Sequence, residues 1–492
     1  MKNSILTLLL ALTTVLALNA ETFTGNIVVN RNGQTYNSVV TVTATQQADG
    51  LNTLVLQVPL FDTMTTMTMT DVPSSYRHGV TVYSAVRDVN TNFGVMTTTV
   101  FARTYDGMMA ANVSIPAQNA TMWFNTVGDY FQLPNSDMEA WTNSNGEPDR
   151  WHGFKTATGT YAGISAGLVK LEQSDDVRSG ATGHSAVMTA NSLAGIVANG
   201  TMTNGRLNAG AMSATSTANH AEMDMANGTD DFYMPLYAKP DKFNVWLKYT
   251  QGTANANNKA SVSVKTFDGT YYQEPTDKTY TNLSGSIVGG PISAGDWTFY
   301  SFPFDYASYA ANGAASEAIF VTFSTNGTPG EGNKGDKLYV DDMELVYLAE
   351  MTDLRYQHVT IEGWNPAVTE YNIQMASVPN LDDFDATVTG ESALVLKSKE
   401  QNADGTYRIA ISAIPADLQA ATCYVINVTV ASFIKGDVNN DGAVNISDVT
   451  VLIDYLLKGS GEINMQAADF DNSGSINISD VTDLIDYLLS GH

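Results

Sequence analysis

Oxygen-bearing side chains recur at a fixed spacing near the end of this sequence. The segment that begins at Asp437 returns 32 residues later at Asp469 (469 − 437 = 32), and each copy spans twelve residues. Ca²⁺ is a hard cation that prefers six to eight oxygen ligands, and a twelve-residue loop supplies them from positions one, three, five, seven, nine and twelve. The residues at these positions are Asp437, Asn439, Asp441, Ala443, Asn445 and Asp448, and then Asp469, Asp471, Ser473, Ser475, Asn477 and Asp480. The repeat therefore predicts two bound calcium ions, with Ala443 and Ser475 contributing backbone carbonyls.

A helix is expected to follow each loop. Gly442 and Gly474 stand at position six, where the sharp turn favours a residue without a Cβ. Apolar residues then recur at i, i+3, i+4 and i+7, which is the spacing of one helix face. They are Val449, Leu452, Ile453 and Leu456 in the first copy, and Val481, Leu484, Ile485 and Leu488 in the second. The two helices can therefore pack on each other, and bound metal is expected to drive their folding because so small a module buries little apolar area.

The two loops depart from an ordinary EF-hand. Position twelve is Asp rather than Glu, and only residues 433–436 precede the first loop, so no incoming helix is expected. This combination resembles type I dockerin domains and covers residues 433–492. The resemblance implies a cohesin domain of another protein as partner, contacted by loop positions ten and eleven, which are Ile446, Ser447, Ile478 and Ser479. Because both copies read Asn-Ile-Ser-Asp-Val-Thr, either face is expected to be offered to the same partner.

The rest of the chain predicts a mainly β, multidomain protein. From residue 25 to residue 131 apolar and polar residues alternate between turn signals such as Asn32-Gly33, as in half-buried strands. This stretch resembles the calycin-like domains of secreted Bacteroidetes proteins, which implies an antiparallel barrel over residues 21–131. Short apolar runs between residues 352 and 432 predict a small Ig-like sandwich, assigned to residues 350–432. The sequence leaves open whether that sandwich is a separate domain.

The segment between these two parts has aromatic strands separated by Gly-, Asn- and Ala-rich loops. Glu139-Ala140-Trp141, Pro148 with Trp151, the run 243–249 and the run 338–345 follow one another in an order that resembles the PCMD family of carbohydrate-metabolism domains. Met138 stands where that family usually has Phe. The family is similar to jelly-roll carbohydrate-binding modules, so the resemblance implies a jelly-roll sandwich over residues 132–349.

Further candidate sites lie in this jelly-roll segment. Glu139 with Asp341 or Asp342 predicts one structural calcium ion; the alternative is solvated strand ends. Sugar binding needs flat aromatic faces flanked by planar polar groups. Two clusters offer that mixture, one formed by Arg150, Trp151 and His152 and the other by Tyr271 and Tyr272. The alternative for both clusters is core packing.

Catalysis has no convincing constellation of residues. The segment 163–167 has the Gly-x-Ser-x-Gly pattern of a nucleophile elbow, but its Gly-rich surroundings are expected to be β-like, whereas an elbow needs a strand, a tight turn and a helix. Asp230 and Asp231 are adjacent carboxylates, and adjacent residues on a strand point to opposite faces.

The net charge and the first residues of the chain limit which partners and which cellular compartment are expected. The chain has 492 residues, with 51 Asp and Glu against 24 Lys and Arg, a formal net charge of −27. Nucleic acid and anionic membranes require a cationic face, so both are excluded as expected partners. Lys2, the apolar stretch 5–18 and Ala20 predict a signal peptide over residues 1–20, which is too short to span a bilayer. The single cysteine, Cys423, excludes a disulfide within the chain and offers no lipid attachment near the new N-terminus.

The sequence thus predicts a secreted, extracellular or periplasmic protein that binds a polysaccharide or another glycan and docks through a calcium-dependent dockerin. Two alternatives stay open. The first is a dockerin-bearing glycoside hydrolase or polysaccharide lyase with its site in residues 133–348. The second is a non-catalytic structural protein of the cell surface.

Overall fold

The computed structural model describes residues 20–490, except residues 33, 61–62, 78–79, 92–93, 106, 127–130, 225–231, 376, 419–420 and 431–432. The predicted signal peptide, apart from Ala20, and the Asp230-Asp231 pair lie outside the described residues. The chain divides into two compact units. One comprises Met1–Asp353, Ala386–Leu396 and Ser412–Cys423, and the other comprises Leu354–Asp385, Lys397–Ile411 and Tyr424–His492.

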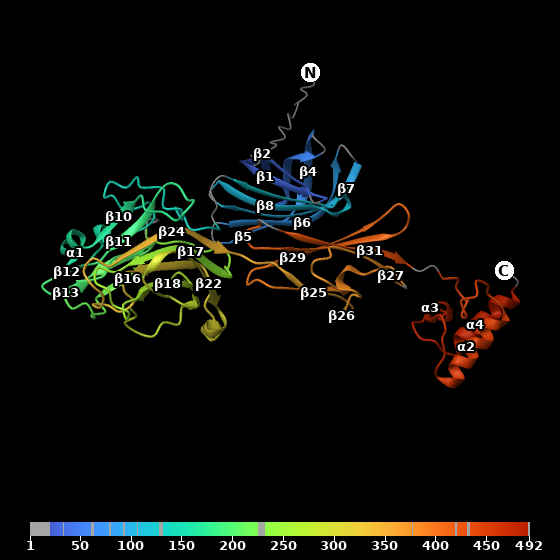
Figure 1. The fold of residues 1–492 in the computed structure, drawn as a ribbon. Helices are drawn as coiled ribbons and strands as arrows, with labels where there is room; N and C mark the ends of the chain where they lie inside the picture. Colours follow the sequence, from blue (N-terminus) through green and yellow to red (C-terminus); the bar gives the residue numbers. More distant parts are fainter. Residues whose placement is uncertain are drawn as a thin grey trace, which may run out of the picture. The chain divides into compact units, whose positions relative to one another are not determined.

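Nine antiparallel strands form the first sheet (Figure 1), in the order β4-β3-β2-β1-β9-β8-β7-β6-β5. Strands β4 and β6, which lie at or near opposite ends of this order, contact each other, and Arg87 on β6 donates a hydrogen bond to the carbonyl of Asp71 on β4 at 2.6 Å. The sheet is therefore curled into a barrel. Alternate side chains such as Ile27, Val29 and Met67 are buried inside it. The strands are β1 (Ala20–Arg31), β2 (Gln34–Gln46), β3 (Asn52–Leu60), β4 (Thr63–Val72), β5 (Ser74–Arg77), β6 (Val80–Thr91), β7 (Gly94–Tyr105), β8 (Met108–Ile115) and β9 (Ala120–Thr126).

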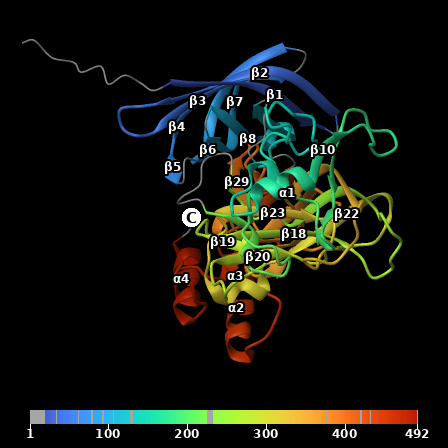
Figure 2. The same cartoon turned by 90° about the vertical axis from the view of Figure 1, so that its left-hand side faces the viewer.

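A two-layered antiparallel sandwich follows. Its first layer has the order β10-β11-β24-β17-β22 and its second the order β20-β18-β23-β14, with β21 beside β18. Strand β22 pairs with β17 along most of its length and with β20 at its end, so it links the layers. The strands are β10 (Lys170–Ser174), β11 (Ser185–Thr189), β14 (Thr201–Thr203), β17 (Lys242–Thr250), β18 (Ala260–Phe267), β20 (Leu283–Ile287), β21 (Pro291–Ile292), β22 (Gly295–Asp305), β23 (Ala318–Ser324) and β24 (Lys337–Val346). Figure 2 shows β18, β20 and β23 from another side.

Strict alternation along β17 creates the core between the two layers. Phe243, Val245 and Leu247 point inward and are buried, while the residues between them are partly exposed. The ring centroid of Phe243 lies 6.4 Å from that of Phe323 on β23, so the inner faces touch. Burying each such side chain stabilises the fold by about 1.5–3 kcal/mol.

Smaller elements cover the ends of the sandwich. Strands β15 (Arg206–Ala209), β16 (Asn219–Met223) and β19 (Tyr272–Glu274) form one sheet, and β12 (Asn191–Leu193) pairs with β13 (Ile196–Ala198). The expectation of β structure around residues 163–167 is wrong, because α1 (Ala162–Leu168) contains them. Ser165 donates its backbone N–H to Tyr161 within this helix and is not at a strand-to-helix turn, so the elbow pattern is accidental.

The last β elements form two more sheets. One has the order β26-β25-β28, and the other the order β27-β31-β30-β29, in which β27 runs parallel to β31. Their bounds are β25 (Met351–Tyr356), β26 (Val359–Thr360), β27 (Glu370–Met375), β28 (Phe384–Val388), β29 (Leu394–Gln401), β30 (Tyr407–Ile414) and β31 (Thr422–Val430). Short 3₁₀ turns also occur at Pro116–Gln118, Phe154–Thr156, Ala307–Asn312 and Leu381–Asp383.

Three helices end the chain: α2 (Ile446–Lys458), α3 (Met465–Ala468) and α4 (Ile478–Leu489). The loop signals and the apolar spacing predicted α2 and α4, which lie side by side in Figure 1. The prediction missed α3, although Asn464 caps it by accepting hydrogen bonds from the N–H groups of Gln466 and Ala467. The expected fold class, mainly β with a small helical module at the C-terminus, is confirmed.

Candidate metal centre and docking surface

The first twelve-residue loop turns back toward its own first carboxylate. Oδ1 of Asp437 accepts a hydrogen bond from the N–H of Asp441 at 3.0 Å, and Oδ2 accepts one from Gly442 at 2.9 Å. Gly442 has φ +88, a left-handed conformation that glycine adopts without a Cβ clash. The remaining oxygens of the loop therefore surround a compact space.

A buried carboxylate at position twelve closes each loop. Asp448 and Asp480 are both fully buried. Oδ1 of Asp448 accepts from the N–H of Asn439 at 3.0 Å, and Oδ2 accepts from that of Asn445 at 2.9 Å. In the second loop, Oδ1 of Asp480 accepts from the N–H of Asp471 at 3.2 Å, and Oδ2 accepts from that of Asn477 at 2.8 Å. Each carboxylate thus ties the third loop position to the start of the following helix.

Asparagine begins both of these helices. The side-chain oxygen of Asn445 accepts from the N–H of Ser447 at 2.8 Å, and Asn477 does the same for Ser479 at 2.8 Å. With the carboxylate at position twelve bonding back to the asparagine N–H, the arrangement is a capping box. Such a cap stabilises a helix by about 1 kcal/mol, so the loop and the helix form together.

Carboxylates converge in the second loop in a way that fits a cation. One oxygen from each of Asp469, Asp471 and Asp480 lies within 4.8 Å of the others. Oδ1 of Asp469 is buried and accepts no hydrogen bond from the described residues. The hydrogen bond from the Ser473 side chain holds the pKa of Asp471 below its usual range, so this carboxylate is charged at neutral pH. A buried acceptor without a donor, set beside two other carboxylates, matches the oxygen donors that Ca²⁺ prefers.

The hydrophobic core of this module is small. Its buried members are Val438, Val449, Leu452, Ala468, Val481 and Leu484. A core of this size leaves little net stability once chain entropy is counted, so small modules commonly rely on metal or disulfides. No disulfide is available, because the chain has a single cysteine.

A second apolar stripe on each helix faces outward. Ile446 is 68% exposed and Ile478 is 69% exposed, at the first position of each helix. Leu457 and Leu489, eleven residues further on, are 79% and 80% exposed. Residues eleven apart lie on the same face of a helix, so each stripe runs the length of its helix. Exposed apolar stripes of this kind mark interaction surfaces.

These loops and helices correspond to a known module. Residues 435–489 match the dockerin type I domain. Dockerin domains typically bind Ca²⁺ and pair with cohesin domains. We refer to residues 433–492, which contain this match, as the dockerin module.

No curated protein matches this chain. One similar solved structure is the M60 catalytic domain with the CBM51-1 and CBM51-2 domains from Clostridium perfringens ZmpB, at 11% identity and a TM-score of 0.16, over 85% of this chain and 40% of that one. Another is the CBM22-1-CBM22-2 tandem from Paenibacillus barcinonensis Xyn10C, at 9% identity and a TM-score of 0.22, over 66% of this chain and 74% of that one. With scores this low, neither likeness carries an argument about fold or function. Within the described residues, no helix is long and apolar enough to cross a bilayer.

The acidic residues proposed for a second metal site behave differently from one another. Oε1 of Glu139 accepts a hydrogen bond from the N–H of His184 at 2.7 Å. It also lies so close to Gly183 that a Cβ on this residue would approach it to 1.9 Å. Asp341 is buried, and its pKa is raised to about 7, first by burial and then by the charge of Asp342. Asp342 itself pairs with Arg178 at 2.7 Å. Arg178 therefore forms an ion pair with Asp342, while its charge only partly offsets the effect of burial on Asp341.

The first predicted sugar cluster is wrong as a stacking platform. Trp151 is fully buried, and its indole N–H donates to the carbonyl of Pro134. His152 is buried as well. Arg150 donates to the carbonyl of Tyr233 at 3.3 Å. The sequence offered Trp151 as a flat surface, but its ring lies in the core, 6.2 Å from Phe323 between centroids.

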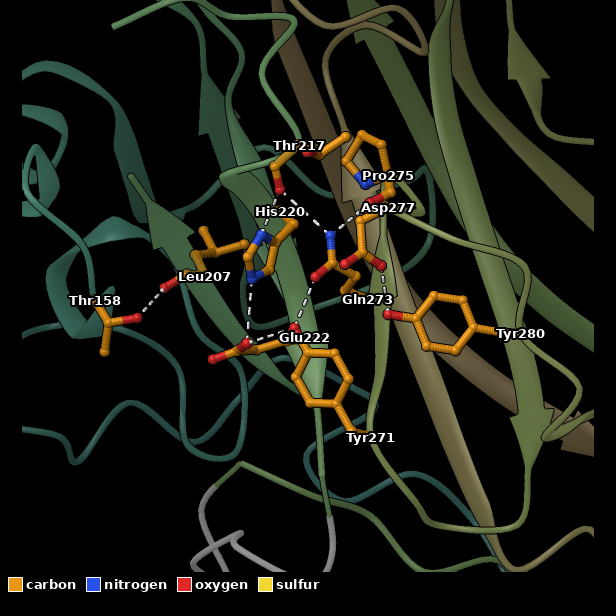
Figure 3. A network of polar contacts seen from close by, with 10 residues as sticks. All are labelled: Thr158, Leu207, Thr217, His220, Glu222, Tyr271, Gln273, Pro275, Asp277 and Tyr280. Carbon is orange, nitrogen blue, oxygen red and sulfur yellow. Dashed lines mark hydrogen bonds and ion pairs between the residues drawn. The ribbon is translucent and has the colours of Figure 1, made fainter. Parts of the chain in front are cut away.

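Part of the second predicted cluster is also unavailable for stacking, and the cluster belongs to a partly buried network of polar contacts (Figure 3). The ring of Tyr272 is buried, and its hydroxyl donates to Glu274. The hydroxyl of Tyr271 lies 3.1 Å from Oε2 of Glu222 and 2.7 Å from Oε1 of Gln273, as Figure 3 shows. The Tyr271 ring is partly exposed, so sugar binding by this residue stays a prediction.

His220 stands at the centre of this network and was not singled out by the sequence. Its Nδ1 lies 2.8 Å from the carbonyl of Thr217 and its Nε2 lies 3.1 Å from Oε2 of Glu222. Both neighbours are acceptors, so the doubly protonated ring fits the site. Burial lowers the pKa of His220, but the hydrogen bonds to Glu222 and Thr217 outweigh burial and raise it.

This network predicts a pH-dependent stability. A histidine with a raised pKa contributes its full stability below its ordinary pKa, about 6.5, and loses it as the pH rises through the folded value. We expect His220→Leu to lower the free energy of unfolding by about 1–3 kcal/mol at pH 6, and by less at pH 9. Calorimetric unfolding of the full chain at both pH values measures the difference. His358→Leu is the control because the side chain of His358 is 90% exposed. An equal loss at both pH values for His220→Leu would contradict the account.

Proposed function

We propose that this protein is secreted, associates with a glycan, and is attached to a cohesin-bearing partner by its calcium-loaded dockerin module. One observation carries the docking part: two equivalent loop–helix units each present an isoleucine at position ten that is over two-thirds exposed. An isoleucine exposed at the start of a rigid helix leaves apolar surface in contact with water and adds nothing to the module's own core. A partner surface that covers it explains its presence.

Two calcium ions belong to this proposal, one in each loop. The first ion takes the side chains of Asp437, Asn439, Asp441, Asn445 and Asp448 with the carbonyl of Ala443. The second takes the equivalent groups from Asp469 to Asp480, including the carbonyl of Ser475. When bound, the ion supplies positive charge that balances the converging carboxylates. The chain's part is to hold these oxygens on two capped helices.

The docking face in this proposal consists of Ile446 and Ser447 in one copy and Ile478 and Ser479 in the other. The helix stripes extend it toward Leu457 and Leu489. Since the two copies have the same residues at these positions, a partner can be bound by either face with the module turned around. Each face alone is therefore sufficient.

Alanine substitutions test the docking face. We expect Ile446→Ala with Ser447→Ala to change the affinity for a cohesin by no more than about twofold, because the second face still binds. Substituting all four residues should weaken binding by at least about 100-fold, the effect of losing two contacts worth about 1.4 kcal/mol each. Biolayer interferometry of the full chain against a panel of type I cohesins, in excess calcium, measures both.

Lys458→Ala with Asp483→Ala is the matched control, since both residues are exposed but lie off the two stripes. This control should bind like the parent chain. Unchanged affinity of the fourfold variant would rule out the proposed face, while failure of the parent to bind any cohesin would rule out docking.

For fragment work we propose the domain boundaries 21–131, 132–349, 350–432 and 433–492, with the signal peptide over residues 1–20. The strands support the first two of these limits. Strands β2 to β9 fall within the first range, as does β1 apart from its first residue, Ala20, and β10 to β24 fall within the second.

We also propose a structural calcium ion beside the sandwich, held by Glu139 and Asp341. The support is electrostatic: burial raises the pKa of Asp341, the charges of Asp342 and then Glu139 raise it further, and the charge of Arg178 offsets this only in part. A divalent cation would reverse that opposition. Asp342 is omitted from the ligand set because Arg178 engages it.

Calcium-dependent unfolding tests this second site in a chain whose dockerin loops carry Asp448→Ala and Asp480→Ala. Calcium at about 100 times its dissociation constant should raise the midpoint of the sandwich transition by roughly 5–10 °C. Adding Asp341→Asn should abolish that rise. The same midpoint in calcium and in chelator, before Asp341 is changed, would refute the site.

A further inference from the structure

A hollow opens on the outer face of the first layer of the sandwich. Its volume is about 530 Å³, and it lies over strands β17, β22 and β24. Its walls include Arg178, Trp246, Phe299, Asp342 and Glu344. None of these residues belongs to the dockerin module or to the two aromatic clusters predicted from sequence.

Strand alternation places the aromatic walls. On β17 the buried residues Val245 and Leu247 flank Trp246, which therefore points outward. Trp246 pairs in register with Phe299 on β22, and their ring centroids lie 5.5 Å apart at an interplanar angle of 55°. Phe299 is 48% exposed. The half-exposed ring of Phe299, inclined by 55° to that of Trp246, therefore presents an apolar face to solvent.

A bulge sets the polar wall of the hollow. The register between β17 and β24 shifts between Asn244 and Trp246. Asp342, on the bulged strand, has φ +47, a left-handed conformation that is uncommon outside glycine. Its carboxylate pairs with Arg178 at 2.7 Å, and the guanidinium of Arg178 lies 5.1 Å from the ring centroid of Trp246. Bulges and strained residues of this kind cluster at functional sites because they re-aim side chains.

Hydrogen bonding fixes the polar groups in place. Asn244 donates from Nδ2 to Oε2 of Glu344 at 2.9 Å. Arg178 is held both by Asp342 and by the face of Trp246, so its remaining donors have a defined direction. Planar donors and acceptors held beside aromatic rings are what a sugar ring requires: its C–H face packs on the aromatic surface and its hydroxyl edge meets the polar groups.

We propose that this hollow binds a neutral polysaccharide chain. Phe299 and Trp246 supply the stacking surface, and Arg178, Asp342 and Glu344 bind hydroxyl groups. The charge of the walls selects against acidic sugars, because Asp137, Asp342, Glu344 and Asp417 outnumber Arg178. This inference rests on the glycan association proposed above and names its site, but it does not depend on docking.

Affinity electrophoresis of the full chain tests the site. The gels contain xylan, galactomannan, mixed-linkage glucan or, as the acidic contrast, polygalacturonate. Each is run once with calcium and once with excess chelator, because chelator removes the calcium proposed at Glu139 and Asp341 as well as that of the dockerin loops. We expect retardation by at least one neutral polymer and none by polygalacturonate. Phe299→Ala should weaken that binding about tenfold, equivalent to about 1.4 kcal/mol, whereas Phe299→Tyr should keep it.

Val288→Ala is the matched control, since Val288 is 56% exposed in the same sandwich but does not line the hollow. Neutral-glycan binding that survives Phe299→Ala combined with Trp246→Ala would overturn the site while leaving glycan association standing. Retardation by polygalacturonate alone would overturn the assignment of a neutral ligand. If no polymer retards the parent chain, the site and the glycan association both fail, and docking remains to be judged from the cohesin experiment.

Discussion

A fully buried carboxylate closes each calcium loop, and the dockerin module depends on how that charge is balanced. Asp448 and Asp480 accept hydrogen bonds from two backbone N–H groups each. Those bonds orient the carboxylate but leave it with a negative charge in a poorly solvated place, which costs several kcal/mol without a counterion. No basic side chain of the described residues is recorded against either carboxylate. A divalent cation in the loop is the partner that the geometry accommodates.

The same two carboxylates connect metal binding to partner recognition. Each one starts a helix, and the exposed isoleucine of each docking face is the first residue of that helix. In the proposed function a bound cation would order the loop, the loop would fix the cap, and the cap would fix the direction in which the isoleucine points. Losing the cation would therefore remove the docking face without any change in the residues that form it. The internal repeat gives the module two such faces of the same chemistry.

The sequence predicted the features that depend on local spacing. Loop positions, glycines at the turns and the apolar period of α2 and α4 could be located because calcium loops and helices are short-range patterns. Alternation likewise predicted the mainly β fold class. The ligand assignments and the domain boundaries stay predictions.

The aromatic sites could not be assigned from spacing because burial is decided by tertiary contacts. Trp151 is in the core although Arg150 and His152 flank it, whereas Trp246 faces outward although Val245 and Leu247 flank it. The alternation of residues 243–249 points Trp246 away from the core, but only the pairing with β22 places Phe299 beside it. The bulge next to Asp342 and the close contact at Gly183 leave no pattern in the sequence, because each requires segments that are distant along the chain.

The most direct measurement is the circular dichroism of residues 433–492 in calcium and in excess chelator. These residues contain α2, α3 and α4 and the module's own small core. Metal-driven folding predicts little helix in chelator and a marked gain of signal at 222 nm when calcium is added. A module that is already fully helical in excess chelator would contradict the central claim that its buried carboxylates require a cation.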